Sequence, residues 1–281
     1  MRTTGRRALL VALTALAGVT AVAGCVGDGE AAQEAPAPPT TTTPAARGPE
    51  ILVGGDSVAA SLVPALTAAV GDRAHVDYLA AATISSTSDR LAWRDGVEGY
   101  DPDLVVALTG PWEVLQPGFA PTEPDWPATY ARDVLDPLAD DLTAGEARVL
   151  WIQMHSASKA ATTLSFAVLA AQVRALADRR DDVDVLDSGE FVDLPGDVPA
   201  ELLPGPDGAP QRIRRQDGTG VHLCPAGVVR LATPVVAWIA DEARLPGLGA
   251  DGWQEASWRW PPELPKPQEC PPAPAPAAST P

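Results

Sequence analysis

The sequence predicts an α/β fold in which a central, mostly parallel sheet of five strands is covered by helices on both faces. Five short apolar runs lack the alternation of a half-exposed strand, which indicates strands that are buried on both faces. Segments with helical spacing separate these runs, as the crossovers between parallel strands require. In such a sheet ligands bind at the carboxyl ends of the strands, so residues that directly follow a strand are the first candidates for a site.

The predicted elements follow one another in regular order. The first strand, residues 51–53, ends in Gly54-Gly55-Asp56-Ser57, and a helix over 58–70 follows. The remaining strands are predicted over 76–79, 104–108, 149–154 and 183–186, and the remaining helices over 85–95, 130–142, 160–177 and 226–243. Residues 189–221 are rich in Gly, Pro, Asp and Arg, which predicts a long surface loop. The residues that directly follow strands, and are therefore cleft candidates, are Ser57, Trp112, His155 and Asp187.

The charge balance argues against a nucleic-acid partner. The 281 residues include 20 Lys+Arg and 37 Asp+Glu, which gives a formal net charge of −17, and only Lys159 and Lys266 are lysines. Phosphate binding needs clustered basic residues, which such a chain does not favour. The hydrophobic content of 46% is sufficient for a globular core and excludes full disorder.

The first 24 residues have the layout of an export signal. Three arginines precede an uncharged run over residues 8–24. Val22-Ala23-Gly24-Cys25 resembles the lipobox of bacterial lipoproteins. This resemblance implies cleavage before Cys25, a lipid on its sulfur and a protein held at the extracytoplasmic face of the cell membrane. A transmembrane anchor is the alternative, but the Ala/Gly/Thr-rich run that ends at the cysteine argues against it.

Two Pro-rich segments flank the predicted domain. Residues 25–49 contain almost no large apolar side chains, which predicts an extended tether. Residues 261–281 are again rich in Pro and Ala and form a predicted tail. The domain is therefore expected over residues 50–260, and about 210 residues are enough to build a core without external support. We expect this domain to be a monomer.

The remaining two cysteines are expected to pair. Cys224 and Cys270 form an even pair in an oxidising compartment, which predicts a disulfide. Closing that loop stabilises the fold by about 4 kcal/mol on the chain-entropy estimate. Two free thiols are the alternative, and a metal site built on two cysteines lacks a CxxC motif or a neighbouring His pair. We therefore expect no metal and no other cofactor.

Gly55-Asp56-Ser57 follows a strand and opens a helix. The amide of Ser57 at a helix N-terminus can stabilise an oxyanion, and its hydroxyl lies at the edge of the sheet. Serine is also a favoured N-cap residue, so the local pattern has an ordinary structural explanation. The motif is not a Gly-x-Ser-x-Gly elbow, because Ala59 stands where the second glycine would be.

A second motif lies before the last predicted helix. Asp217 and His222 bound the Gly-rich segment Asp-Gly-Thr-Gly-Val-His. A neutral imidazole near Ser57 could accept its proton, and an acidic partner would hold the ring in the required tautomer. A surface histidine at the start of a helix is the alternative interpretation.

The two motifs together, in this order across an α/β domain, resemble the SGNH (GDSL-type) hydrolase family over essentially the whole predicted domain. The resemblance implies a flavodoxin-like three-layer α/β/α sandwich. It also implies Ser57 as nucleophile, His222 as general base and Asp217 as the acid that orients the base. Ester hydrolysis or acyl transfer through an acyl-enzyme would follow.

The acid departs from the family pattern. The family spaces its acid as Asp-x-x-His, whereas the residue three before His222 is Thr219. Asp217 is five before, so the loop must bulge at Gly218 and Gly220 for the carboxylate to reach the ring. If the loop does not bulge, a Ser–His dyad remains.

The oxyanion donors depart from the pattern as well. The family's Asn follows a glycine, whereas Gly110 is followed by Pro and then by Trp112 at the Asn position. Loss of one oxyanion donor typically costs about 100- to 1000-fold in rate. The family's oxyanion glycine is not evident in residues 80–86, where Ala82, Thr83 or Ser85 could supply a backbone N–H instead.

Trp112 also belongs to a stretch that points to a subgroup. Gly110-x-Trp112-Glu113 and His222-Leu-Cys-Pro-x-Gly are similar to the SGNH domains attached to membrane O-acyltransferases, which modify cell-surface polysaccharides. Other residues carry two interpretations. His155 could line the cleft or form structural hydrogen bonds, Trp112 could stack a sugar or pack in the core, and Glu113 could bond in the cleft or be solvated. Three tryptophans near the end of the chain could bind glycan or cover the edge of the sheet: Trp253, Trp258 and Trp260. Three arginines before the histidine motif could hold an anion or belong to a solvated loop: Arg212, Arg214 and Arg215.

The sequence therefore predicts a lipid-anchored serine esterase or O-acyltransferase. Its expected substrates are O-acyl groups, acetyl first among them, of a cell-envelope carbohydrate, or another small ester. The alternative is a non-catalytic envelope module of the same fold that binds glycan or a membrane acyltransferase partner. Trp112 in place of Asn favours the second prediction, while Ser57 and His222 favour the first. A transporter's substrate-binding lipoprotein is disfavoured, because such proteins usually need two lobes.

Overall fold

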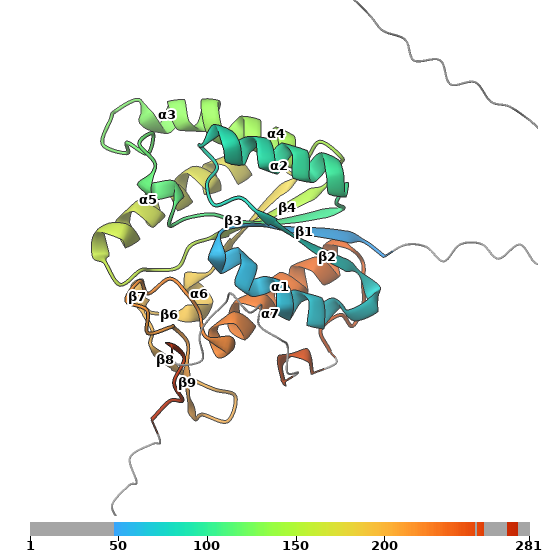
Figure 1. The fold of residues 1–281 in the computed structure, drawn as a ribbon, viewed down its shortest axis with the longest axis vertical. Helices are drawn as coiled ribbons and strands as arrows, with labels where there is room; N and C mark the ends of the chain where they lie inside the picture. The colour runs from blue at the N-terminus through green and yellow to red at the C-terminus, as the bar shows by residue number, and fades with distance from the viewer. Residues whose placement is uncertain (1–47, 251, 256–268, 275–281) are drawn as a thin grey trace, which may run out of the picture. The chain divides into compact units, whose positions relative to one another are not determined.

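The computed structural model describes residues 48–250, 252–255 and 269–274. The predicted signal, the lipobox cysteine, most of the predicted tether and tail, Trp258 and Trp260 lie outside the described residues. One sheet of five parallel strands runs in the order β2-β1-β3-β4-β5, which confirms the predicted parallel α/β sheet (Figure 1). Its strands are β1 (Glu50–Gly55), β2 (His75–Ala80), β3 (Leu104–Leu108), β4 (Arg148–Gln153) and β5 (Val183–Asp187).

Helices cover both faces of this sheet, so the three-layer α/β/α architecture is also confirmed (Figure 1). One face carries α1 (Ser57–Val70) and α7 (Pro225–Glu242), and the other carries α2 (Thr87–Tyr100), α4 (Asp136–Leu142) and α5 (Ala160–Ala177). Successive strand residues alternate between the two layers of core: Leu104 and Val106 of β3 face α1 and α7, whereas Val105 faces the opposite helices. The three central strands, β1, β3 and β4, are therefore apolar on both sides, which explains their continuous apolar runs, whereas the edge strands β2 and β5 are half-buried and carry Asp77 and Asp184.

The strand order places the site. The chain runs outward from β1 to β2 and then returns to β3 on the other side of β1, so the direction of winding reverses between β1 and β3. At such a point the loops that leave the carboxyl ends of the two strands turn to opposite faces and open a crevice. Ser57 directly follows β1, and Gly110 and Trp112 directly follow β3.

Two glycines at the end of β1 allow this strand to lie close to its neighbours. A Cβ on Gly54 would lie 2.1 Å from the ring of Trp93 in α2. Gly55 has φ 145°, and a Cβ there would lie 1.9 Å from the carbonyl oxygen of Leu108 in β3. Only glycine fits this backbone and this contact, so the Gly-Gly pair fixes the turn that delivers Ser57 to the edge of the sheet.

The helix predicted over 130–142 is three consecutive segments, which corrects the prediction. α3 (Trp126–Tyr130) leads into a π-helical turn over Ala131–Leu135, and α4 follows. Pro137 at the start of α4 has no N–H and displaces the carbonyl four residues earlier, so the regular hydrogen-bond pattern is interrupted there. α2 also begins two residues later and ends five residues later than predicted, because Ser86 caps it and Gly96 and Gly99 remain helical.

The segment predicted as one long loop, 189–221, contains regular structure. It holds α6 (Gly189–Val192) and two small antiparallel hairpins, β6 (Asp193–Leu194) with β7 (Val198–Pro199) and β8 (Leu202–Pro204) with β9 (Pro210–Arg212). These strands are two or three residues long and lack an apolar alternation, so the sequence carries no strand signal for them.

The predicted disulfide is present. Cys224 and Cys270 are bonded with their Cα atoms 5.7 Å apart. Cys224 precedes the first turn of α7, so the disulfide fixes residues 269–271 beside the start of that helix. Among the described helices, α5 alone has the length and apolar composition to cross a membrane, and it packs Leu169, Val173 and Leu176 into the core beside the sheet.

Candidate active site

Ser57 is the first residue of α1, but it does not cap the helix. The carboxylate of Asp56 accepts the N–H of Val58 at 2.8 Å and so takes the capping position. The Ser57 hydroxyl is therefore free to bond elsewhere, and its backbone N–H lies among the first amides of a helix, which have no partner within the helix. This division between two adjacent residues resolves the ambiguity that the sequence left at Ser57.

The capping carboxylate is unusually situated. Asp56 is 4% exposed, and burial raises its pKa to about 6 against the hydrogen bonds from the amides of Val58 and Ala59. The hydroxyl of Tyr78 in β2 donates to the carbonyl oxygens of Gly55 and Asp56 at 3.1 and 3.2 Å. The backbone on the N-terminal side of Ser57 is thus held by both the cap and the neighbouring strand.

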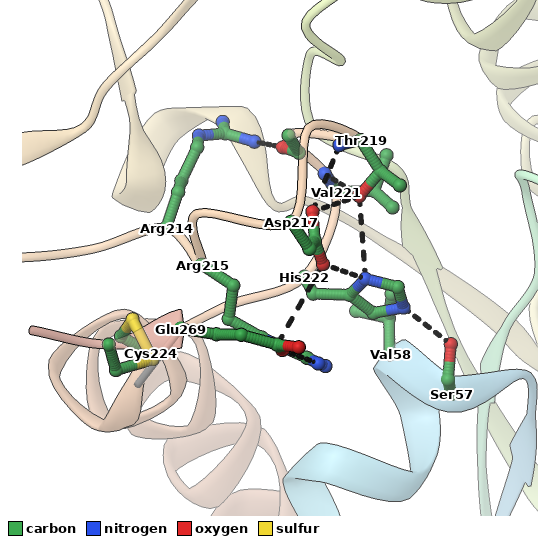
Figure 2. A network of polar contacts seen from close by, with 12 residues as sticks. Ser57, Val58, Arg214, Arg215, Asp217, Thr219, Val221, His222, Cys224 and Glu269 are labelled. Atoms are coloured by element: carbon green, nitrogen blue, oxygen red, sulfur yellow. Dashed lines mark hydrogen bonds and ion pairs between the residues drawn. A yellow bond between two sulfur atoms is a disulfide. The ribbon is translucent and has the colours of Figure 1, made fainter. Parts of the chain in front are cut away.

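Ser57, His222 and Asp217 form one hydrogen-bonded chain (Figure 2). The Ser57 Oγ lies 2.8 Å from His222 Nε2, although the two residues are 165 positions apart in the sequence. On the other side of the ring, His222 Nδ1 lies 2.6 Å from Asp217 Oδ2. Burial raises the pKa of Asp217, but hydrogen bonds from Thr219 and His222 outweigh it, so the pKa lies below its usual value. A charged carboxylate on Nδ1 favours the tautomer with a proton there and a lone pair on Nε2 that faces Ser57.

The loop does bulge in the way that the five-residue spacing requires. Gly218 and Gly220 have φ of 79° and 73°, both in the left-handed region. Thr219, which stands where the family has its Asp, donates both its N–H (2.9 Å) and its hydroxyl (2.7 Å) to Asp217 Oδ1. The two oxygens of Asp217 are therefore divided between the loop and the imidazole.

The buried side chain of Arg214 holds the same loop through hydrogen bonds to backbone carbonyls. Arg214 is 2% exposed and donates to the carbonyl oxygens of Ser156 (2.8 Å) and Gly220, and it pairs with the carboxylate of Asp193. The basic run is therefore not a solvated loop, which corrects the expectation for these residues. The extended backbone between β9 and α7 turns alternate side chains inward, and no local sequence signal marks which arginine finds a buried carboxylate.

Its neighbour Arg215 points to the other side, toward the tail (Figure 2). Arg215 Nε donates to Glu269 Oε2 at 2.8 Å and lies 3.7 Å from Asp217 Oδ2. Sequence reasoning missed Glu269, because it lies between a Pro-rich tail and a cysteine; the predicted disulfide was the signal that could have brought it to this loop.

The hydrogen bonds of the three candidate backbone donors, Ala82, Thr83 and Ser85, show which of them is free to bind an oxyanion. The N–H groups of Thr83 and Ser85 are engaged, with Asp89 Oδ2 at 2.7 Å and with Glu113 Oε2 at 3.1 Å. The N–H of Ala82 has no partner among the described residues, so of these three it is the one free to bind an oxyanion. Gly110 is buried, and a Cβ there would lie 2.1 Å from Met154. Trp112 is 54% exposed, which corrects the expectation that it packs in the core.

Glu113 connects the loop after β3, on which it lies, to the loop after β2. Its side chain is fully buried and accepts the N–H groups of Ile84 (2.8 Å) and Ser85, and the hydroxyl of Tyr130 at 2.6 Å. Burial and the adjacent carboxylate raise the pKa of Tyr130, so its hydroxyl remains a donor. Glu113 therefore fixes the loop that carries Ala82 against the loop that carries Trp112, rather than being solvated.

A protein-family model described as "Protein of unknown function (DUF459)" matches residues 50–238. The chain belongs to the DUF459 family. None of the curated proteins matches it.

The DUF459 chain is also similar in fold to several solved structures. A family 3 carbohydrate esterase of Clostridium thermocellum aligns at 15% identity and TM-score 0.48, over 70% of this chain and 98% of the other. The C-terminal catalytic domain of the peptidoglycan O-acetyltransferase A of Streptococcus pneumoniae aligns at 17% identity and TM-score 0.45, over 70% and 95%. A lipase/acylhydrolase of Enterococcus faecalis aligns at 18% identity and TM-score 0.46, over 70% and 96%. At these identities the activities named for those proteins are not carried over to this chain.

In this DUF459 protein His155 is buried behind the loop that carries His222 and makes no hydrogen bond with Ser57. It is 1% exposed, and its Nε2 lies 2.7 Å from the carbonyl oxygen of Val221 while its Nδ1 lies 3.2 Å from Ser188 Oγ. Burial and the charge of Arg214 lower its pKa to about 3, so the ring is neutral. These contacts favour the structural interpretation of His155, in which it holds the carbonyl that precedes His222.

One cavity of about 110 Å³ is lined by His155 together with residues of α5 and of the segment after β5. Asp187, the fourth cleft candidate, lines it and pairs with Arg174 at 2.9 Å. Ser57, Asp217 and His222 do not line this cavity.

A different group could hold a metal ion. Glu50, His75 and Asp77 bring ligand atoms within 4.8 Å of one another at the amino ends of β1 and β2. His75 Nε2 already lies 3.2 Å from Asp77 Oδ2. The group is at the opposite end of the sheet from Ser57, so a cation there would not take part in chemistry at Ser57.

Proposed function

We propose that the domain is a serine esterase or O-acyltransferase in which Ser57 is the nucleophile, His222 the general base and Asp217 the acid that orients the base. The observation that carries this proposal is the hydrogen-bonded chain of the three side chains, 2.8 and 2.6 Å long at its two links. A serine that is activated by a neighbouring imidazole, with a carboxylate behind the ring, is the arrangement that nucleophilic acyl transfer requires.

The proposed reaction follows from these positions. His222 Nε2 takes the proton of the Ser57 hydroxyl as the oxygen attacks the ester carbonyl, and the charge of Asp217 stabilises the resulting imidazolium. The N–H groups of Ser57 and Ala82 stabilise the oxyanion, and His222 then gives its proton to the leaving alkoxide. The acyl group remains on Ser57 until water or a sugar hydroxyl, deprotonated by His222, attacks it.

The proposed substrates are O-acetyl groups of a cell-envelope carbohydrate or another small ester. The exposed indole of Trp112 at the carboxyl end of β3 suits the face of a sugar ring. The disulfide supports an oxidising, extracytoplasmic location. We propose further that Cys25 carries the lipid anchor, which labelling of wild-type and Cys25→Ser cells with a radioactive fatty acid would test.

The test is hydrolysis of a p-nitrophenyl ester series, from acetate to longer chains, by the purified full chain. Ser57→Ala and His222→Ala should each reduce the rate to the background. Matched controls are Ser88→Ala on the exposed face of α2 and His75→Ala at the other end of the sheet, which should retain full activity. Equal rates in the wild type and Ser57→Ala would contradict the esterase.

A second candidate function has one observation in its favour. In the resemblance to SGNH hydrolases Trp112 stands where the oxyanion Asn is expected, and its indole is exposed, which favours a non-catalytic module that binds glycan. The two candidates separate if the wild type hydrolyses no ester and transfers no acetyl group to oligosaccharides, yet binds them in titration calorimetry and loses binding in Trp112→Ala.

A further inference from the structure

The segment around Cys270 lies against the loop that carries Asp217, and three connections fix it there. The disulfide joins Cys270 to Cys224, the N–H of Gln216 donates to the carbonyl oxygen of Glu269 at 2.7 Å, and Arg212 Nε donates to that of Pro271 at 2.8 Å. A short piece of tail is thus ordered beside the loop between β9 and α7.

This segment brings the carboxylate of Glu269 to the candidate site. Arg215 donates through Nε and Nη2 to Glu269 Oε2, while its Nε lies 3.7 Å from Asp217 Oδ2. The same Asp217 oxygen lies 2.6 Å from His222 Nδ1 (Figure 2). Arg215 therefore has two carboxylates within reach, and its hydrogen bonds go to the one on the tail.

The pairing of Arg215 with Glu269 rather than with Asp217 affects the electrostatics around His222. A guanidinium bonded to Asp217 would compete with the imidazole for the oxygen, and its positive charge would oppose formation of the imidazolium. Glu269 holds the N–H groups of Arg215 and neutralises its charge. Asp217 is left to orient His222.

We propose that Glu269, held in place by the Cys224–Cys270 disulfide, is a positioning residue of the Ser57–His222–Asp217 site, and that reduction of this disulfide lowers the activity. The proposal rests on the proposed function. Reduction takes up two electrons and two protons from a dithiol reductant, which becomes a disulfide, and leaves two thiols, so that Glu269 is no longer tied to α7.

Several charged or titratable groups lie on the elements around His222. They are Asp217 and Arg215 on its own loop; Arg214, paired with Asp193, against that loop; His155 after β4; Asp56, which caps α1 beside Ser57; and Glu269 on the tail. Substitution of Glu269 and Arg215 by Gln changes one charge each and leaves the others in place.

The experiment follows the titration of His222 by NMR in the full chain, whose three histidines are readily assigned. In Glu269→Gln the free charge of Arg215 should move the titration of His222 to lower pH than in the wild type, and kcat/KM at pH 7 should fall several-fold. In Arg215→Gln the unpaired Glu269 should move it to higher pH. The double variant should return toward the wild type.

Opposite shifts distinguish a charge effect on the site from a merely structural role, which would lower stability without them. The matched control is Glu201→Gln, which removes a carboxylate from the neighbouring Arg212 and should leave the titration and the rate unchanged. Wild-type titration in both single variants, or shifts in the same direction, would overturn the positioning role.

The redox half is tested with dithiothreitol on protein whose folding is checked by circular dichroism. Reduced wild type and the Cys224→Ser/Cys270→Ser variant should both have a lower kcat/KM than the oxidised protein, and the variant should not respond to the reductant. A reduced, folded wild type with full activity would overturn this half. Failure of the proposed function is seen separately, as absence of ester chemistry in the wild type, and the His222 titration then still decides the positioning role.

Discussion

At the scale of single residues, the candidate site depends on which neighbour takes each hydrogen bond. Asp56 caps α1, so the hydroxyl of Ser57 is available to His222. Thr219 takes one oxygen of Asp217, so the other is left for the imidazole. In both places an aspartate oxygen accepts a backbone N–H, and the group that bonds to the imidazole stays available: the hydroxyl of Ser57 in the first and Oδ2 of Asp217 in the second.

Asp217→Asn should lower kcat of ester hydrolysis by about 100-fold or more, because an amide neither fixes the productive tautomer nor stabilises the imidazolium. The steady-state rate of p-nitrophenyl acetate hydrolysis measures this. Asp207→Asn is the matched control, since Asp207 also accepts an N–H two residues on, at 2.9 Å, in a turn away from Ser57. An unchanged kcat in Asp217→Asn would mean that Ser57 and His222 act as a dyad.

His155 makes stability depend on pH in a direction that its burial sets. The unfolded chain protonates this histidine near pH 6.5, whereas the folded protein keeps it neutral down to about pH 3. Between these values the unfolded state binds more protons, so stability falls as the pH falls, by about 1.4 kcal/mol per unit. Between pH 7 and pH 5 the wild type should therefore lose about 2 kcal/mol more than His155→Gln.

Urea unfolding at the two pH values measures this difference. Asp56, with its pKa raised to about 6, contributes with the opposite sign in part of this range, but it is common to both proteins and cancels. His75→Gln, a substitution at an exposed histidine, should keep the pH dependence of the wild type. Identical pH dependence in His155→Gln and the wild type would contradict the assignment.

Sequence reasoning could predict residues whose role is carried by local pattern, and it could not predict those whose partners lie elsewhere in the chain. Ser57 and His222 each lie in a short motif near the start of a helix, and their pairing was implied by the resemblance that the two motifs carry together. Arg214 and Glu113 are buried by contacts with segments 58 and 29 positions away, and nothing adjacent to them in the sequence marks that burial. Long-range partners are set by topology rather than by neighbours.

At the scale of elements, the loop of Asp217 depends on two glycines with different surroundings. Both have positive φ, but a Cβ on Gly220 would lie 2.3 Å from Ser158 Oγ and 2.6 Å from its N, whereas a Cβ on Gly218 would meet open space. Gly218→Ala should therefore cost only the left-handed backbone, about 1 kcal/mol. Gly220→Ala should cost more and also displace Asp217, with a large loss of kcat.

Urea midpoints and kcat of the two alanine variants test this pair against each other. The loop also packs on Ser158, whose N–H donates to the carbonyl of Thr219 at 3.1 Å, so displacement at Gly220 is transmitted to the residue that holds Asp217. Equal effects in the two variants would show that the contact with Ser158 does not fix the loop.

The elements themselves were predictable where apolar spacing is regular. The five strands are short apolar runs, and the long helices α1, α5 and α7 repeat apolar residues at helical spacing, so their positions in the chain were predicted correctly. The prediction of one helix over residues 130–142 was wrong, because Pro137 interrupts the hydrogen-bond pattern without interrupting the apolar spacing. The short hairpins after β5 were not predicted, because strands of two or three residues have no period to detect.

At the scale of the whole molecule, the sheet brings together residues from its two halves. Ser57 lies at the start of α1, directly after the first strand, and His222 lies in the segment before the last helix; only the order β2-β1-β3-β4-β5 with α1 and α7 on one face makes them neighbours. The resemblance of two motifs implied this arrangement, whereas periodicity alone gave the class of the sheet and not its strand order. The tail was predicted as a segment without a core, yet Glu269 and Pro271 bond to the loop that ends the domain.

The disulfide should therefore matter for stability as well as for the site. It closes a separation of 46 residues, and on the chain-entropy estimate its loss lowers the free energy of unfolding by about 4 kcal/mol. For a domain whose total is about 5–15 kcal/mol, this is a large fraction, but the core on both faces of the sheet should keep the reduced protein folded at 25 °C.

Urea unfolding of the oxidised wild type, the reduced wild type and Cys224→Ser/Cys270→Ser measures the effect. The last two should agree with each other and lie about 4 kcal/mol below the first, and only the wild type should respond to the reductant. A difference under about 1 kcal/mol would mean that the hydrogen bonds of Gln216 and Arg212 hold the tail without the disulfide. In that case Glu269 would stay beside Arg215 after reduction, and the site would not be redox-sensitive.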